Sequence, residues 1–223
     1  MKLLLLPSFI RRFTLIILLG PSLAFSFLLF TISILFYPVV FIHRKVSLSK
    51  NSSSRYIRFS LMIVWYLLME CLGTIIALFL WVGTMGGYFM HSRSSQRMHA
   101  LVQYLWASSL LIGVRLFFNA RIIFPDCSVF NSGPLLIAAQ HSSFFDALLP
   151  TVLLGKGGGS IVPRHVLKSG LLLSPSLDFY GNRLPNKFVG RSSTTHDLDI
   201  SGVYSIGKEL HKDACVIFPE GTF

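Results

Sequence analysis

The stretch Pro134-Leu135-Leu136-Ile137-Ala138-Ala139-Gln140-His141-Ser142-Ser143-Phe144-Phe145-Asp146 decides the expected fold. Its apolar first part follows a Ser-Gly pair, which predicts a short buried strand over 134–139. Polar residues at the end of such a strand lie at the carboxyl edge of the sheet, where α/β folds keep their chemistry. A helix is expected over 143–154, with His141 on the loop and Asp146 in the first turn. Imidazole takes up a proton near neutral pH, and a nearby carboxylate stabilises its charged form.

The His-to-Asp spacing alone also fits a purely structural role. Ser142 or Ser143 could cap the following helix by accepting hydrogen bonds from its first amides. Asp146 would then complement the positive end of the helix dipole. Spacing by itself favours this structural interpretation over a catalytic one, so the interpretation depends on the rest of the chain.

A second stretch repeats the pattern near the C-terminus: Cys215-Val216-Ile217-Phe218-Pro219-Glu220-Gly221-Thr222 is again an apolar strand, expected over 214–218, that ends in a polar loop. A further strand is expected at 121–124, before the first stretch. Between the two stretches, a strand is expected at 161–163 and a helix at 196–211. The glycine-rich run 155–160 lacks the spacing of a nucleotide-binding loop and is expected to be a flexible connection. Alternating strands and helices predict an α/β sandwich.

The two motifs in this order, each closing a strand, resemble the glycerolipid acyltransferases of the 1-acylglycerol-3-phosphate acyltransferase type. The resemblance covers about residues 110–223. It implies transfer of a fatty acyl group from acyl-CoA or acyl carrier protein to the free hydroxyl of a lysophospholipid, in phospholipid biosynthesis or remodelling. Neither a metal nor a resident cofactor is implied, and the expected partners are membrane lipids, the acyl donor and the lysophospholipid, without nucleic acid.

The resemblance also assigns roles to individual residues. His141 is the general base that takes the proton of the acceptor hydroxyl, and Asp146 orients it. Phe188-Val189-Gly190-Arg191 fits the end of the family's second motif, so the resemblance implies Arg191 as the first phosphate ligand, followed by Arg183 and Lys187. In the last motif, Glu220 and Thr222 would contact acceptor oxygens and Gly221 would let the backbone approach.

Three departures from the family's pattern bear on the substrate. Gln140 stands where the family usually has Asn, and Phe223 stands where it commonly has Arg. The spacing from Gly181 to Arg191 is longer than usual. Loss of the Arg after Thr222 removes one expected phosphate contact and leaves the headgroup of the acceptor open.

The family continues beyond its last motif with further strands and helices. The sequence is therefore expected to hold the acyltransferase domain at 98–223 in its first part only, and to be inactive as these 223 residues alone. A sheet without its later strands would expose an edge and apolar surface.

Composition and charge indicate a membrane protein. Apolar residues make up 52% and charged residues 13% of the chain, against about 25% charged in soluble domains. Residues 1–125 hold twelve Lys or Arg and one acid, whereas residues 126–223 hold eight of each sign. The net charge of +11 thus belongs to the apolar half, where cations suit anionic lipid headgroups rather than nucleic acid.

Two apolar segments, at about 13–42 and 59–90, predict a membrane anchor over residues 1–97. The first holds 30 residues without a charge, and about 20 suffice to cross a bilayer. A cleaved signal peptide is the alternative for the first segment, but Arg11 and Arg12 split its apolar region. Glu70 inside the second segment is either functional or marks the membrane edge. A helix over 98–114 is expected to be too short to span, and to lie at the interface or on the core.

Membrane orientation stays open at this point. The basic linker between the segments would be cytosolic by the positive-inside rule, against an active site expected on the cytosolic side. Segments that enter one leaflet and return would remove that conflict. The expected location is the bacterial inner membrane or the endoplasmic reticulum.

Two other classes of function compete with acyl transfer. The chain could be a non-catalytic relative that serves as a membrane anchor or interaction module. Lipid hydrolysis through a Ser nucleophile would call for a Gly-x-Ser-x-Gly elbow, which the sequence lacks. Cys71, Cys127 and Cys215 show no paired or metal-ligand spacing and are expected to be buried, inert thiols.

Overall fold

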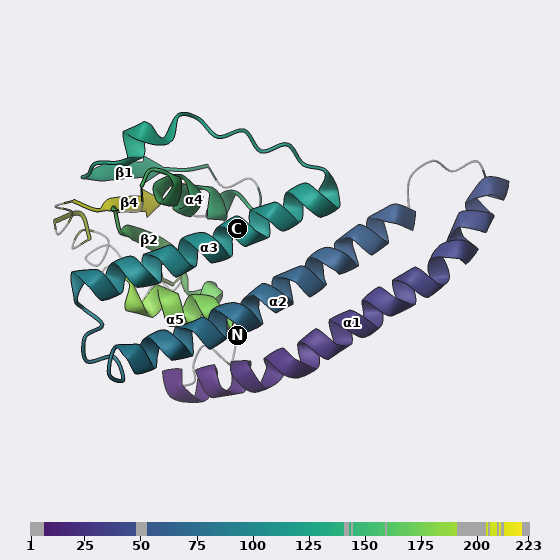
Figure 1. The fold of residues 1–223 in the computed structure, drawn as a ribbon, viewed down its shortest axis with the longest axis horizontal. Coiled ribbons are helices and arrows are strands. Elements are labelled where there is room, and N and C mark those ends of the chain that lie inside the picture. Colours follow the sequence, from purple (N-terminus) through teal and green to yellow (C-terminus); the bar gives the residue numbers. More distant parts are fainter. Residues whose placement is uncertain are drawn as a thin grey trace.

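A computed structural model describes residues 7–47, 53–140, 143, 145–158, 160–190, 204, 206–208, 210 and 212–219. Three long helices are followed by a small α/β unit (Figure 1). The helices are α1 (Ser8–Ser47), α2 (Ser53–Gly83), α3 (Arg93–Phe118), α4 (Leu149–Lys156) and α5 (Pro175–Arg183). The strands are β1 (Leu135–Ala138), β2 (Pro163–Lys168), β3 (Lys187–Val189) and β4 (Ala214–Ile217). Short 3-10 turns are η2 (Cys127–Phe130), η3 (Asp146–Leu148) and η4 (Ser169–Leu173).

The two expected apolar segments form α1 and α2, and both are long and apolar enough to cross a membrane. Their ends differ from the expected bounds, because α1 begins at Ser8 and α2 ends at Gly83. Residues 84–92 turn instead of continuing the helix, with positive φ at Met85, Gly86 and Gly87. Glycine adopts that conformation without steric cost. The Gly-Gly pair therefore favours the turn that follows the second segment.

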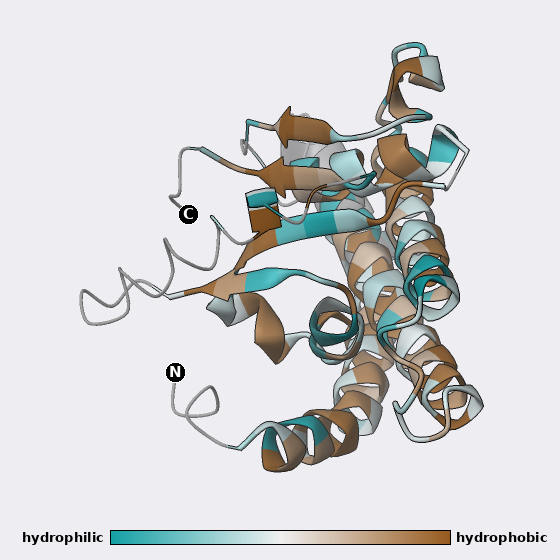
Figure 2. Cartoon of the chain, turned by 90° about the vertical axis from the view of Figure 1, so that its left-hand side faces the viewer, coloured by the Kyte–Doolittle hydropathy of each residue, from teal (hydrophilic) through white to brown (hydrophobic). Residues whose placement is uncertain are grey.

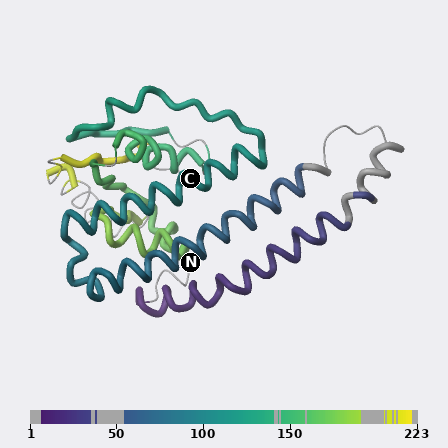
Figure 3. Tube along the Cα trace, in the orientation of Figure 1, coloured from purple at the N-terminus to yellow at the C-terminus, as the bar shows by residue number. Residues whose placement is uncertain are grey.

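Helix α1 is continuous from Ser8 to Ser47. At 1.5 Å per residue, Arg11 and Ser47 lie up to about 54 Å apart. That length exceeds a hydrocarbon core of about 30 Å. Neither α1 nor α2 reverses direction along its length, and their far ends project beyond the α/β unit (Figure 3). The apolar helices indicate association with a membrane.

The third helix is longer than expected. Ser92 caps the start of α3 by accepting a hydrogen bond from the Ser95 amide, and Asn119 ends it in the left-handed conformation. With 26 residues, α3 is also long and apolar enough to cross a membrane, so the expectation that it is too short was wrong. Its buried face, which includes His99 and Leu110, packs on α2, α4 and α5, as the core-packing alternative predicted.

The sheet has the strand order β1-β4-β2-β3, and every pair is parallel. Ala138 is in register with Ile217, and Lys168 is in register with Val189. The apolar runs at 134–139 and 214–218 therefore form strands as expected. Parallel strands need crossover connections, and α4 and α5 supply two of them.

Helices α4 and α5 cover the same face of the sheet, which Figure 2 shows beside the long helices. On that face the His165 ring contacts Thr151 of α4, while the Phe188 ring lies against Gly181 of α5. Leu167, two residues after His165 on β2, is in register with Phe188, so these side chains point the same way. The three long helices pack over this layer.

The other face of the sheet is open at β1, where Leu136 keeps 68% of its side chain exposed. The helix expected over 196–211 lies mostly outside the described residues, although 206–208 are helical. The structure thus contains a parallel sheet with one face covered by helices. The described chain is mostly helical, as the coarse expectation of N-terminal helices followed by an α/β unit requires.

Three expected elements were misplaced. Residues 121–124 form no strand, because Arg115 binds the Ile122 carbonyl at 2.8 Å and holds this segment over α3. The strand expected at 161–163 begins only at Pro163 and continues to Lys168. The helix expected from residue 143 is a 3-10 turn from Asp146 that leads into α4.

The glycine-rich run after α4 packs closely, although the sequence suggested a flexible connection. A Cβ atom on Gly157 would lie 2.8 Å from the Phe130 carbonyl oxygen. We expect Gly157→Ala to lower the free energy of unfolding by about 1–3 kcal/mol through overpacking. Denaturant unfolding in detergent measures this, with Gly170→Ala as control because its Cβ would meet only Lys168 Cε at 4.0 Å. Equal stabilities of the two variants would contradict the prediction.

Candidate functional site

The carboxyl ends of the four parallel strands lie at one edge of the sheet, which we call the motif edge because the first and last motifs follow it in the sequence. At this edge the Ala139 amide donates a 3.0 Å hydrogen bond to the Ile217 carbonyl. Ala139 lies two residues before His141, and Ile217 lies three residues before Glu220. The described strands therefore bring the starts of the first and last motifs next to each other. Gly190, which precedes Arg191, follows the carboxyl end of β3.

Five of the predicted site residues lie outside the described residues. They are His141, Arg191, Glu220, Gly221 and Thr222. Asp146, Arg183 and Lys187 are described, and so are the residues that precede each undescribed motif. The His141–Asp146 pair therefore stays a prediction from the sequence.

Asp146 begins the 3-10 turn η3 directly after the edge. Its Oδ2 accepts a 2.6 Å hydrogen bond from the Ser143 amide, and its own amide donates to the Ser143 carbonyl at 3.1 Å. The carboxylate thus reaches back over the loop that contains the first motif. This contact differs from the expected cap, because the Ser143 amide donates to Asp146 and η3 has no side-chain cap. A carboxylate accepts several hydrogen bonds, so the same geometry accommodates a histidine partner.

Arg183 and Lys187 lie away from the carboxyl ends of the strands. Lys187 begins β3, and Arg183 ends α5 ahead of that amino end. Arg183 Nη1 donates to the Ala77 carbonyl of α2 at 2.7 Å, and burial lowers the pKa of Arg183 to about 10. Its guanidinium is directed to the long helices rather than to the motif edge. We therefore leave Arg183 out of the proposed substrate site.

Lys168 is a cation at the motif edge that the sequence analysis did not single out. It is the last residue of β2, it is exposed, and it is in register with Val189 of β3. The local signal was weak, since Pro163–Lys168 mixes basic and apolar residues. It was missed because that strand was expected to end at residue 163.

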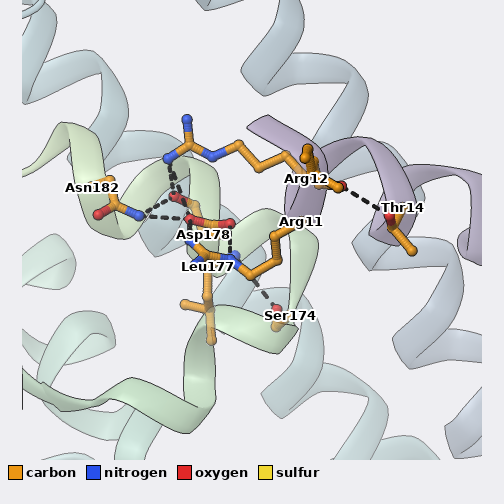
Figure 4. Close-up of polar contacts among 8 residues, drawn as sticks. Arg11, Arg12, Thr14, Ser174, Leu177, Asp178 and Asn182 are labelled. Carbon is orange, nitrogen blue, oxygen red and sulfur yellow. Dashed lines mark hydrogen bonds and ion pairs between the residues drawn. The ribbon is translucent and has the colours of Figure 1, made fainter. Parts of the chain in front are cut away.

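A polar cluster between the long helices and α5 was also missed. The Arg11 guanidinium makes two 3.0 Å hydrogen bonds to the buried Asp178 carboxylate. Arg12 and Asn182 bind the same carboxylate at 3.3 and 2.7 Å (Figure 4). The two arginines that flank the first apolar segment therefore hold α1 against α5.

Glu70 makes the second polar contact between a long helix and α5. Its buried carboxylate accepts hydrogen bonds from the Ser176 hydroxyl at 2.8 Å and the Ser174 hydroxyl at 3.0 Å. Ser174 is the N-cap residue of α5 and Ser176 lies in its first turn, where the helix dipole favours a negative group. Glu70 thus docks α2 onto the α/β unit, a role that neither sequence interpretation included.

The other polar features give no indication of a metal centre or disulfide. Within the described part of the chain, no three His, Cys, Asp or Glu side chains are grouped to hold a metal ion. All three cysteines are free thiols, and Cys215 is buried as expected. Burial raises the pKa of Cys215. Cys71 and Cys127 are only half-buried, which corrects the expectation for these two.

His165 in β2 is a buried titratable group whose pKa burial lowers to about 4. An unfolded histidine titrates near pH 6.5, so below that pH the unfolded chain binds a proton that the folded chain does not. The contribution of neutral His165 to the free energy of unfolding is therefore fully present above pH 6.5, and it is lost as the pH falls toward 4. The loss is about 3 kcal/mol over that window.

Unfolding in detergent at pH 7 and at pH 4.5 measures this loss. We expect His165→Gln, which does not titrate there, to show a shallower fall in unfolding free energy than the unmodified protein. The exposed His91→Gln serves as the matched control and should keep the full fall. A His165→Gln protein with the full fall would exclude this residue as its source.

No family model matches the chain, and comparisons with curated proteins and with solved structures also give no match.

Proposed function

We propose that this protein is a membrane-anchored O-acyltransferase. It moves a fatty acyl group from acyl-CoA or acyl carrier protein to the free hydroxyl of a lysophospholipid, with 1-acylglycerol-3-phosphate as the first candidate acceptor. The observation that carries the proposal is the hydrogen bond between Ala139 and Ile217. It joins two strands at the points where the His141–Asp146 motif and the Glu220–Thr222 motif begin.

The proposed reaction breaks the thioester carbon–sulfur bond and forms a carbon–oxygen ester bond. His141 takes the proton of the acceptor hydroxyl as its oxygen attacks the thioester carbonyl, and then returns a proton to the leaving thiolate. Asp146 holds the imidazole in the productive tautomer and stabilises its charged form. The position of Asp146 at the first turn after β1, with its carboxylate turned back to Ser143, supports this role.

A phosphorylated acceptor needs fixed cations, and arginine binds a phosphate through two parallel hydrogen bonds. Arg191 follows the carboxyl end of β3 by sequence, and Lys168 ends the neighbouring β2. We assign the phosphate to this pair and leave Lys187 out, because it begins β3 at the opposite edge of the sheet. Glu220 and Thr222 would contact the acceptor oxygens, and Gly221 would give the backbone room.

The long helices suit a reaction on lipids. Both the acceptor and the product are membrane lipids, and α1 and α2 are long and apolar enough to cross the bilayer. The contacts of Asp178 with Arg11 and of Ser176 with Glu70 fix the α/β unit to these helices. We place the active site on the cytosolic side of the bacterial inner membrane or the endoplasmic reticulum.

The second candidate is a non-catalytic membrane anchor or interaction module. The bond between the Asp146 carboxylate and the Ser143 amide favours it, since that bond gives Asp146 a structural role without any histidine. In that case the first motif only starts the helical segment that follows β1.

An acceptor panel tests the proposal and separates these candidates. Membranes that contain the full-length protein are given labelled acyl-CoA, either alone or with 1-acylglycerol-3-phosphate or a lysolipid without a phosphate monoester. Transfer to the phosphate-bearing lysolipid supports the proposal, and a preference lost in Arg191→Gln supports the phosphate site. Release of free fatty acid without an acceptor would indicate a hydrolase. No turnover of any kind would indicate the non-catalytic module.

A further inference from the structure

A cavity of about 350 Å³ lies between α3 and α4, away from the motif edge. That volume is at the lower end of the range of small-molecule pockets, about 300–1,000 Å³. Pro163, which lines it, begins β2, and Gly158 follows the end of α4. The cavity therefore lies toward the amino edge of the sheet, whereas the proposed active site lies at the carboxyl edge.

The walls of this cavity are largely apolar. They include Met98, Leu101 and Tyr104 from α3, and Leu154 and Ile161 from the α/β unit. A straight apolar chain is the ligand that such walls accommodate, because burying each methylene group contributes about 0.8 kcal/mol. A strongly polar ligand would lose its hydration there without enough hydrogen bonds in return.

The cavity opens beside an apolar stripe on α3. Leu101 lines the cavity and is 54% exposed, and one turn further along Leu105 is 52% exposed. Ile112 and Leu116 continue the stripe on the same side of the helix. The stripe therefore places apolar surface of α3 next to the cavity.

One cation lies at the cavity without a counter-charge. Arg97 lines the cavity and is exposed, and its guanidinium forms no ion pair or hydrogen bond with any residue within the described ranges. Its neighbour Arg93 is already paired with Asp213. An anionic headgroup is the charge that complements Arg97, and the apolar stem of the arginine can lie along an acyl chain.

We propose that the cavity between α3 and α4 binds one acyl chain of an anionic phospholipid, with the lipid phosphate at Arg97. This is a second lipid site, separate from the acyl-transfer site. Its occupant is a membrane phospholipid that is held rather than converted, because the cavity and the motif edge lie at opposite edges of the sheet.

Photo-crosslinking tests the proposal on the full-length protein in phosphatidylcholine vesicles. The probe is phosphatidylglycerol with a photoreactive diazirine in one acyl chain, and the labelled peptides are mapped by mass spectrometry. We expect labels on the peptides that contain residues 98–104 and 151–158. Leu101→Trp should remove these labels by filling the cavity, whereas Leu105→Trp, an equally exposed position outside it, should retain them.

Arg97→Gln tests the headgroup contact. We expect the preference for the phosphatidylglycerol probe over a matched phosphatidylcholine probe to fall about fivefold. His141→Ala should label the cavity like the unmodified protein, so this result is independent of acyl transfer. Labels confined to α1 and α2, or equal labelling in Leu101→Trp and Leu105→Trp, would overturn the proposal. An unchanged headgroup preference in Arg97→Gln would overturn the assignment of the phosphate to Arg97.

Discussion

Replacing His141 with alanine is expected to lower the rate of acyl transfer by about 10²- to 10⁴-fold, the usual loss when a positioned general base is removed. In the proposed reaction the acceptor hydroxyl gives up its proton as it attacks, and we propose His141 as the base that takes it. The measurement is the initial rate of labelled phospholipid formation from acyl-CoA and 1-acylglycerol-3-phosphate in membranes with equal amounts of protein.

The matched control for this variant is His91→Ala. His91 is exposed in the turn before α3, and its replacement should leave the rate unchanged. Equal unfolding temperatures of the two variants would show that the His141→Ala protein is folded. If His141→Ala transferred acyl groups at the unmodified rate, His141 would not be the base and the first motif would be a structural cap.

The second large effect is expected at Asp178, whose side chain is fully buried against Arg11. Arg11 is itself buried, with 7% of the residue exposed. Asp178→Ala therefore leaves a buried guanidinium without its counter-charge. Breaking a buried pair from one side costs about 3–5 kcal/mol. We expect a loss of that size in the free energy of unfolding in detergent, together with faster proteolysis where α1 meets α5.

Two further variants isolate this interaction. Asp126→Ala removes an exposed carboxylate that caps η2 through Ser128, and should lower the free energy of unfolding far less than Asp178→Ala does. Arg11→Met combined with Asp178→Ala should recover part of the loss, because no buried charge is then left unpaired. Similar losses for Asp178→Ala and Asp126→Ala, or no recovery in the double variant, would contradict the docking role of Asp178.

The sequence alone predicted those elements whose signal is local. The apolar runs before Gln140 and Phe218 have the length and flanking residues of buried strands, and both form strands in the parallel sheet. Two long apolar segments, the first without a charge and the second with Glu70 as its single charge, predicted α1 and α2 without reference to the rest of the fold. Helix α5 was missed because Pro175–Arg183 mixes polar and apolar residues. Its place in the fold depends on the contacts of Ser176 with Glu70 and of Asp178 with Arg11.

The polar docking contacts could not be predicted for the same reason. Arg11 and Asp178 are 167 residues apart in the chain, and the sequence gives no local signal that pairs them. From the sequence, Arg11 was interpreted as a basic residue that flanks the first apolar segment. Glu70 was interpreted either as a functional acid or as a residue at the membrane edge. Their roles depend on how α5 packs on the long helices, which no periodicity reveals.

The candidate site could also be predicted only in part from the sequence. The residue types of the first and last motifs follow from the sequence, and the pairing of β1 with β4 adds that the two motifs begin side by side. Arg183 had the right charge for a phosphate ligand, yet it binds the Ala77 carbonyl of α2. Lys168 was found only through the register of β2 with β3. Charge can be read from the sequence, whereas the edge of the sheet at which it lies comes from the fold.

We propose above that this protein transfers an acyl group to a lysolipid hydroxyl. The most direct test uses the purified full-length protein in phospholipid vesicles, with acyl-CoA labelled in its acyl group and 1-acylglycerol-3-phosphate. We expect the label to move into a two-chain phospholipid only when the acceptor is present, and we expect His141→Ala to abolish this transfer. Label that stays in acyl-CoA, or that appears in the phospholipid equally with His141→Ala, would contradict it.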